Sequence, residues 1–228
     1  MSLREGCGLK CRESPLELVF VIDSSESVGP ENFEVVKDFV NTLIDRMSVS
    51  REASRVGVVL YSHVDVVVVS LTQQSSQDDV KAAVRKMAYL GEGTFTGSAI
   101  QRANRLFQAA RPGVRKVALV LTDGQADRRD AVQPEDAAAE AHAAGIEVFV
   151  IGVVNKSDPQ YAEFQAEMNA IASDPDEEHV YLIDDFMTLP SKRPLSLSVR
   201  PRRFQAFTLT WIVLSTIVRI VPKNRLMT

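Results

Sequence analysis

The sequence is poor in the residues on which several specialised classes of protein depend. Only two of its 228 residues are cysteines, which is too few for a small fold held together by disulfides. Its 11 glycines follow no Gly-X-Y period, so this chain cannot itself form a collagen triple helix. Its three histidines share no metal-ligand spacing. What remains, with 45% hydrophobic and 25% charged residues, is typical of an ordinary globular domain.

Acidic residues are missing from the last part of the chain. All 30 Asp and Glu residues lie within residues 1–190, together with 18 of the 26 Lys and Arg residues, so this part carries a net charge of −12. Residues 191–228 hold the other eight basic residues and no acid, which gives +8. So sharp an asymmetry indicates two segments with different origins or partners. The acidic part and the basic tail therefore need separate interpretations.

The first 14 residues lack the apolar segment of a secretory signal peptide. This leaves open both an intracellular domain and a fragment or variant of a longer protein. Cys7 and Cys11 precede the first apolar run, and their spacing alone decides neither the compartment nor whether they pair with each other.

Short apolar runs alternate with patterns of helical period between residues 16 and 186. The runs that predict strands are residues 16–23, 55–62, 63–72, 114–124, 146–153 and 179–186. The patterns that predict helices are residues 30–47, 75–87, 98–110, 134–144 and 161–173. The alternation predicts an α/β fold with a doubly wound, Rossmann-like sheet, mostly parallel and covered by helices on both faces. Because only a short break separates residues 55–62 from 63–72, we expect these two strands to be antiparallel, with the second at a sheet edge.

Two of the predicted strands end in an aspartate that is followed by small residues. Asp23 begins the sequence Asp-Ser-Ser-Glu-Ser, and Asp123 is the middle residue of Thr-Asp-Gly. Residues 93–97, Gly-Thr-Phe-Thr-Gly, form a third loop that precedes a helix. Ligands of doubly wound sheets bind beyond the carboxyl ends of the strands, so we expect these loops to meet at one edge. Their carboxylates and hydroxyls are the hard donors that suit Mg²⁺ or Mn²⁺, and they leave room for an incoming carboxylate.

The order of these residues resembles the metal-ion-dependent adhesion site of von Willebrand factor type A domains. The matching motifs are Asp23-x-Ser25-x-Ser27, Gly-Thr94-x-Thr96-Gly and Thr122-Asp123-Gly124. The segments FVIDSSESVG, RVGVVLYS, GTFTGSAI and VALVLTDG resemble the collagen and matrilin branch of this family, nearest to collagens of types VI and XXVIII. The resemblance extends over about residues 11–189.

This resemblance implies a role for each matched residue. Ser25 and Ser27 would bind the metal directly, and Thr94 would join them in the ligand-competent state. Asp23 and Asp123 would bind it directly or through water. The metal would be Mg²⁺, with Mn²⁺ or Ca²⁺ as alternatives. The family's usual Gly-Gly-Thr is replaced here by Gly-Glu92-Gly-Thr, so an extra carboxylate is expected at the rim of the site.

The resemblance also implies a fold and a function. The sheet would have five parallel strands, one antiparallel edge strand and about six helices. The protein would be a non-enzymatic module of the extracellular matrix or of cell adhesion, secreted and from a family that is often oligomeric. It would bind matrix or cell-surface proteins, not nucleic acid, through an acidic side chain of the partner.

Other interpretations of these loops stay open. Residues 23–25 also suit a cap of the first helix, and Thr96 suits a helix cap better than a metal ligand. Residues 128–130 suit a solvated surface turn. The glycines of the loops suit tight turns: Gly93, Gly97 and Gly124.

Two other functions are alternatives to metal-dependent adhesion. One is a Mg²⁺-dependent Rossmann-like phosphohydrolase, whose nucleophilic aspartate would end the first strand. Haloacid-dehalogenase-like enzymes of this kind typically carry a second aspartate two residues later, where this chain has Ser25. The other is a type A interaction domain that works without a metal.

The sequence divides into three parts. They are an N-terminal segment (1–14), a von Willebrand factor type A domain (15–189) and a basic and apolar tail (190–228). By resemblance, a closing cysteine would follow the domain and pair with Cys7 or Cys11, but no cysteine follows Cys11. Residues 204–221 are mostly apolar but include Arg219, and a membrane span needs about 20 apolar residues. We therefore favour a tail outside the domain over a membrane contact or a docked helix.

Overall fold

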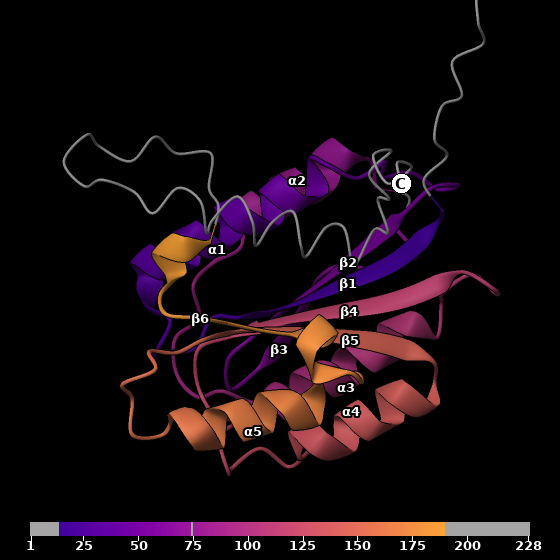
Figure 1. The fold of residues 1–228 in the computed structure, drawn as a ribbon. Coiled ribbons are helices and arrows are strands. Elements are labelled where there is room, and N and C mark those ends of the chain that lie inside the picture. The colour runs from indigo at the N-terminus through magenta and orange to yellow at the C-terminus, as the bar shows by residue number, and fades with distance from the viewer. Residues whose placement is uncertain (1–13, 74, 190–228) are drawn as a thin grey trace, which may run out of the picture.

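A computed structural model describes residues 14–73 and 75–189. Its centre is a six-stranded sheet in the order β3-β2-β1-β4-β5-β6 (Figure 1). The strands are β1 (Leu16–Asp23), β2 (Arg55–Tyr61), β3 (Asp65–Val69), β4 (Arg115–Thr122), β5 (Ile146–Val153) and β6 (Val180–Ile183). Only the pair β2 and β3 is antiparallel, and β3 lies at the edge. The predicted fold is thus confirmed, with the edge strand where the sequence placed it.

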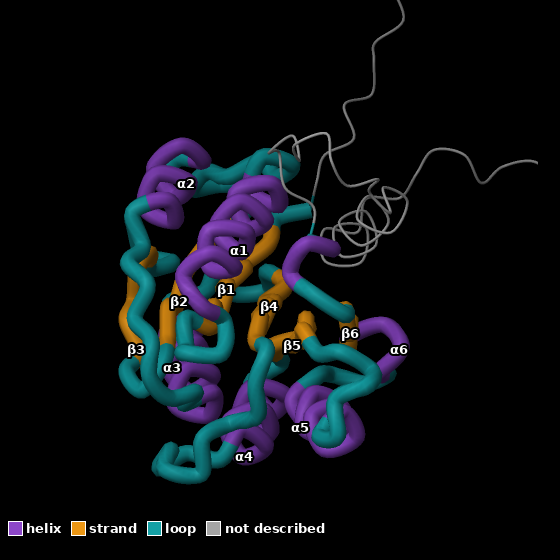
Figure 2. The backbone as a smooth tube through the Cα atoms, turned by 90° about the vertical axis from the view of Figure 1, so that its left-hand side faces the viewer, coloured by secondary structure: helices purple, strands orange, loops and turns teal. Residues whose placement is uncertain are grey.

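Helices cover both faces of this sheet (Figures 1 and 2). They are α1 (Gly29–Ile44), α2 (Gln77–Arg85), α3 (Thr96–Phe107), α4 (Pro134–Ala143), α5 (Tyr161–Ile171) and α6 (Asp176–His179). Helices α1 and α2 pack on one face, together with a short 3₁₀ helix at Phe186–Thr188. Helices α3, α4 and α5 pack on the other face.

The central strand β1 shows why the chain needs both layers. All eight of its residues are buried. Successive side chains of a strand point to opposite faces, so Phe20 and Ile22 pack toward α1 while Val19 and Val21 pack toward α3. An almost continuous apolar run therefore predicts a strand that is covered on both faces.

Helix α1 ends three residues before the predicted limit at Met47. The N–H groups of Arg46 and Met47 donate to the carbonyls of Leu43 and Ile44, three residues back. This tighter pattern often closes the last turn of a helix, whereas the apolar spacing runs on to Met47 because that side chain is still in the core.

Several sequence-based predictions fall outside the described residues. They concern Cys7, Cys11, the tail from residue 190 onward and its apolar segment 204–221. Within residues 14–73 and 75–189, no helix is long and apolar enough to cross a membrane.

Candidate metal centre

The three predicted loops meet beyond the carboxyl ends of β1 and β4. The Ser27 hydroxyl donates a hydrogen bond of 2.7 Å to Asp123 Oδ1, across 96 positions of sequence. The Oγ atoms of Ser25 and Ser27 lie 3.1 Å apart. A Cβ atom placed on Gly124 would lie 3.4 Å from Ser27 Oγ and 3.9 Å from Thr94 Oγ1. The hydroxyls of Ser25, Ser27 and Thr94 and the Asp123 carboxylate therefore gather around one small space.

Asp23, the fifth predicted residue, lies beneath this group and is fully buried. Its Oδ1 accepts the backbone N–H of Ser25 at 2.8 Å, and its Oδ2 accepts the Thr122 hydroxyl at 2.6 Å. Burial raises the pKa of Asp23, although these hydrogen bonds lower it in part. Both oxygens of the carboxylate are thus held in place by the protein.

Asp123 is mostly buried and carries the clearest electrostatic signal in the site. Burial raises its pKa to about 7, the Ser27 hydrogen bond lowers it, and the nearby charge of Asp23 raises it further. No lysine, arginine or histidine in the described part of the chain forms an ion pair with Asp23 or Asp123. Two neighbouring carboxylates without a counter-charge favour the binding of a cation.

The donor set fits a hard divalent cation. All five predicted groups are oxygen donors, of the kind that Mg²⁺ prefers. Across residues 14–73 and 75–189, no group of three or more His, Cys, Asp or Glu residues could hold a metal. A cation at this edge would therefore depend on serine and threonine hydroxyls as well as on the two aspartates.

Ser24 and Tyr89, neither of which was predicted as a metal ligand, hold the loops together. Ser24 Oγ accepts the backbone N–H of Leu90 at 2.9 Å, and the Ser24 carbonyl accepts that of Gly91 at 2.9 Å. The Tyr89 hydroxyl donates to the Ser25 carbonyl at 3.1 Å. Nothing in the local pattern around Tyr89 indicates this role, because its partner lies 64 residues away in the sequence.

The helix-cap interpretation of residues 23–25 is wrong. Helix α1 begins at Gly29, its N-cap residue is Val28, and no side chain caps it. The Asp23 carboxylate instead bonds to Ser25 and Thr122. These residues therefore shape the loop at the end of β1.

The cap predicted at Thr96 is also wrong. Thr96 is the first residue of α3, and its buried hydroxyl lies 3.3 Å from that of Tyr61. Asp130 performs the capping from a distant loop, since its Oδ2 accepts the backbone N–H of Ser98 at 2.9 Å. Asp130 is only 4% exposed, which contradicts the solvated turn predicted for residues 128–130, although Arg128 and Arg129 are exposed.

The three glycines have different roles. Gly93 has a positive φ of +32°, a backbone conformation that favours glycine. Gly97 does not lie in a turn, because it belongs to α3, and a Cβ atom there would lie 2.0 Å from the Val132 carbonyl oxygen. It permits a close approach of two backbones. Gly124 borders the space between Ser27 and Thr94.

The extra carboxylate of Glu92 lies at the rim of the site. Its side chain is 78% exposed, and its Oε2 lies 3.4 Å from His63 Nδ1. Nearby, Asp127 forms an ion pair with Arg129, which lowers the pKa of Asp127 to about 2. The rim therefore carries charges of both signs around the neutral hydroxyls.

Comparisons with known proteins agree with this geometry. Residues 17–193 match the model of the von Willebrand factor type A domain. The chain is 41% identical over 180 residues to matrilin-1 of Gallus gallus, covering 77% of this chain and 34% of that protein. It is 38% identical over 184 residues to the collagen alpha-1(XXI) chain of Homo sapiens, covering 80% and 18%. The chain thus spans about a third or less of these relatives.

Solved structures show the same fold. The proximal thread matrix protein 1 from the mussel byssus matches with a TM-score of 0.66 at 26% identity, over 77% of this chain and 43% of that one. Another structure of the mussel protein, described as having a zinc-occupied MIDAS motif, matches with a TM-score of 0.66 at 24% identity, over 87% and 46%.

Proposed function

Because this chain belongs to the von Willebrand factor type A domain family, we propose that it is a non-enzymatic matrix module that binds protein partners through a divalent cation. The predicted collagen and matrilin branch is confirmed by the relatives. The finer resemblance to collagens of types VI and XXVIII stays a prediction.

The relatives support a role outside the cell. Matrilins and collagens are secreted structural proteins of the extracellular matrix and not enzymes, in agreement with what the family resemblance implied. Since the chain covers a minor part of each, the activity of the whole protein is inferred from this domain alone. The phosphohydrolase alternative receives no support from these relatives.

One observation carries the metal-binding part of the proposal. Asp23 and Asp123 are close enough for the charge of one to raise the pKa of the other, and no cationic side chain of residues 14–73 and 75–189 pairs with either. Ser25, Ser27 and Thr94 surround them with neutral hydroxyls. When bound, a divalent cation would supply positive charge toward which a carboxylate of the partner is attracted.

The protein's own residues would prepare this encounter. Hydrogen bonds from Ser25 and Thr122 hold the Asp23 carboxylate, and Ser24 and Tyr89 fix the neighbouring loop. Ser27 is exposed and lies at the entrance. Because three of the five donors are uncharged, they leave much of the cation's charge available to an acidic ligand. We name Mg²⁺ as the cation, with Mn²⁺, Ca²⁺ and the zinc of the mussel protein as competitors.

Calorimetric titration of the purified chain with Mg²⁺ and Mn²⁺ tests metal binding. We expect saturable binding that weakens at least tenfold in Asp123→Asn, which removes a negative charge from the site, and in Ser25→Ala, which removes a hydroxyl donor. Glu26→Gln is the matched control, because it removes a negative charge from the same loop but from an exposed side chain. Equal weakening in the control, or no heat in the wild type, would contradict a specific site.

Capture of partners from matrix extract, in Mg²⁺ and in EDTA, tests the function itself. The proposal requires capture that EDTA abolishes and that Ser25→Ala reduces. Equal capture in EDTA would favour the alternative in which the domain binds its partners without a metal.

A further inference from the structure

A polar pocket lies at the opposite end of the sheet from the candidate metal centre. It has a volume of about 110 Å³ and is lined mainly by Ser50, Arg51, Arg55, Thr72, Gln73 and Ser75. Arg55 is the first residue of β2, so the pocket lies at the amino ends of the parallel strands. The antiparallel course of β3 returns the chain to this end at Ser70, directly after Val69.

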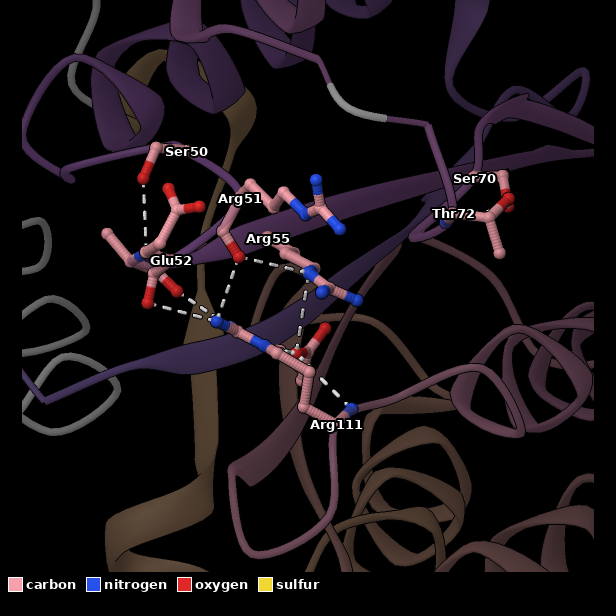
Figure 3. Close-up of polar contacts among 9 residues, drawn as sticks. Ser50, Arg51, Glu52, Arg55, Ser70, Thr72 and Arg111 are labelled. Carbon is pink, nitrogen blue, oxygen red and sulfur yellow. Dashed lines mark hydrogen bonds and ion pairs between the residues drawn. The ribbon is translucent and has the colours of Figure 1, made fainter.

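Two arginines give the pocket its positive charge. Arg51 is exposed, and no described residue accepts a hydrogen bond from its guanidinium group. Among the described residues, Arg55 contacts its partners only through Nε, which lies 3.4 Å from the Arg51 carbonyl and 4.0 Å from Glu17 Oε1. In Figure 3 both guanidinium groups extend in the same direction, toward the segment that carries Ser70 and Thr72. Their terminal N–H groups are therefore available to a ligand.

A third arginine holds this arrangement in place. Arg111 donates to the carbonyls of Arg51, Glu52 and Ala53 at 3.1, 3.0 and 2.6 Å. Its Nε also donates to the buried carboxylate of Glu17. These bonds turn the carbonyls of residues 51–53 toward Arg111 (Figure 3). The loop that presents Arg51 is thus fixed before any ligand arrives.

The charges of this cluster do not cancel. Glu17 is fully buried, and Arg111 pairs with it directly, so the charge of Arg55 is only partly compensated. Arg51 adds a second charge. Within the described residues, the exposed Glu52 forms no ion pair with either guanidinium group. A surplus of positive charge therefore faces the pocket.

The facing wall supplies hydrogen-bond donors. The Oγ atoms of Ser70 and Thr72 lie 2.9 Å apart in a turn closed by the N–H of Gln73, which donates to the Ser70 carbonyl at 3.1 Å. The Gln73 side-chain oxygen accepts the Ser70 N–H at 3.0 Å, which leaves its NH₂ group free to donate. Two arginines opposite a hydroxyl and an amide form a set rich in donors.

We infer that this pocket binds a tetrahedral oxyanion, a sulfate or phosphate group, between the guanidinium groups of Arg51 and Arg55 and the donors of Thr72 and Gln73. Guanidinium groups form paired, charge-assisted hydrogen bonds with the oxygens of such groups. The volume suits one oxyanion and not an extended apolar ligand. The group comes either from the free anion or from an ester on a polysaccharide chain. This site is independent of the proposed metal centre.

Titration of the full chain with sodium sulfate and sodium phosphate tests the inference, against sodium chloride at matched ionic strength and in EDTA. We expect saturable amide shifts in nuclear magnetic resonance spectra at residues 70–73. Arg51→Gln should weaken binding about tenfold, because it removes a charged donor pair. Arg51→Lys should recover part of this loss, since it restores the charge but not the fork. The Arg51 guanidinium group has no partner among the described residues, and the variants keep the backbone carbonyl that Arg55 and Arg111 contact, so they should keep the thermal midpoint of the wild type.

The control variant is Arg128→Gln, which removes an exposed arginine at the other end of the sheet. Equal binding by the wild type and Arg51→Gln would overturn the inference, as would equal weakening by Arg128→Gln. A sulfated oligosaccharide, compared with the same sugar without sulfate, distinguishes the two sources. If Arg51→Gln lowers the affinity for the sulfated oligosaccharide as much as the affinity for free sulfate, the sulfate ester is a ligand. If Arg51→Gln lowers only the affinity for free sulfate, the site binds the free ion. Loss of metal binding in Asp123→Asn with unchanged sulfate binding would separate the two proposals.

Discussion

At the scale of single residues, Asp123 makes the stability of the metal-free protein depend on pH. Its pKa is about 7 in the folded state, against about 4 in an unfolded chain, because burial and Asp23 disfavour its charged form. The folded state therefore holds this proton more tightly. The resulting stabilisation is fully present below about pH 4 and is lost as the pH rises through 7.

We expect the free energy of unfolding in EDTA to fall by about 2–4 kcal/mol more in the wild type than in Asp123→Asn between pH 4 and pH 8. Urea denaturation at intervals of one pH unit measures the difference. Asparagine has the shape of aspartate and keeps an oxygen that accepts the Ser27 hydroxyl, but it carries no charge. The comparison therefore isolates the effect of ionisation. Parallel pH profiles for the two proteins would show that Asp123 ionises normally.

Gly97 is a position where a close contact between two backbones, and not a turn, requires glycine. In Gly97→Ala the new methyl group would meet the Val132 carbonyl oxygen at 2.0 Å; the backbone of α3 fixes the methyl group, and the oxygen is itself a backbone atom. We expect a loss of about 3 kcal/mol or more in the free energy of unfolding, measured in urea. Gly113→Ala is the control, since its φ is +73° but nothing lies within 4 Å, and it should cost about 1 kcal/mol. Similar losses in both variants would contradict the clash.

At the scale of elements, α3 depends on a cap from another part of the chain. Asp130 accepts the backbone N–H of Ser98, and its side chain also accepts the Ser98 hydroxyl and the N–H of Val132. Removal of this carboxylate would leave the N–H groups of Ser98, in the first turn of α3, and of Val132 without this acceptor. Because α3 begins just after Thr94, the same change would loosen one wall of the metal centre.

We expect Asp130→Ala to lower the free energy of unfolding by about 2 kcal/mol, at the upper end for the loss of a helix cap. Ser76→Ala is the comparison, since Ser76 caps α2 locally and at an exposed position, and it should cost about 1 kcal/mol. Only the Asp130 variant should also weaken Mn²⁺ binding in calorimetry. A loss of stability no larger than that of Ser76→Ala would contradict the role assigned to Asp130.

Elements defined by their own residues could be predicted from the sequence, whereas features that depend on contacts between distant residues could not. Strand β5 falls at its predicted residues, because an apolar run between turn residues is a property of the segment itself. The cap of α3 could not be predicted, since Asp130 lies 32 residues from Ser98 in the chain. In the same way, the motifs indicated Ser25 and Asp123, but they do not reveal that Tyr89 supports the loop that carries Ser25.

At the scale of the whole molecule, the direction of the strands separates the two proposed sites. Asp23 and Asp123 follow the carboxyl ends of β1 and β4, whereas Arg51 and Arg55 lie at the amino end of β2. Parallel strands of about eight residues place these ends about 25 Å apart. The fully buried strand β1 and the almost fully buried strand β2 lie between them, and no residue belongs to both sites.

This separation predicts that a cation and an oxyanion bind without influencing each other. The sulfate affinity of the full chain should change less than twofold when saturating Mg²⁺ replaces EDTA, because distant sites without shared partners behave additively. In the double variant Ser25→Ala with Arg51→Gln, the Mg²⁺ affinity should fall as much as in Ser25→Ala alone. The sulfate affinity should fall as much as in Arg51→Gln alone. A change of fivefold or more in the affinity for one ligand when the other is bound would mean that β1 and β2 shift together when one site is filled. The two ends would then act as one binding unit, a result that the buried and closely paired strands of this sheet argue against.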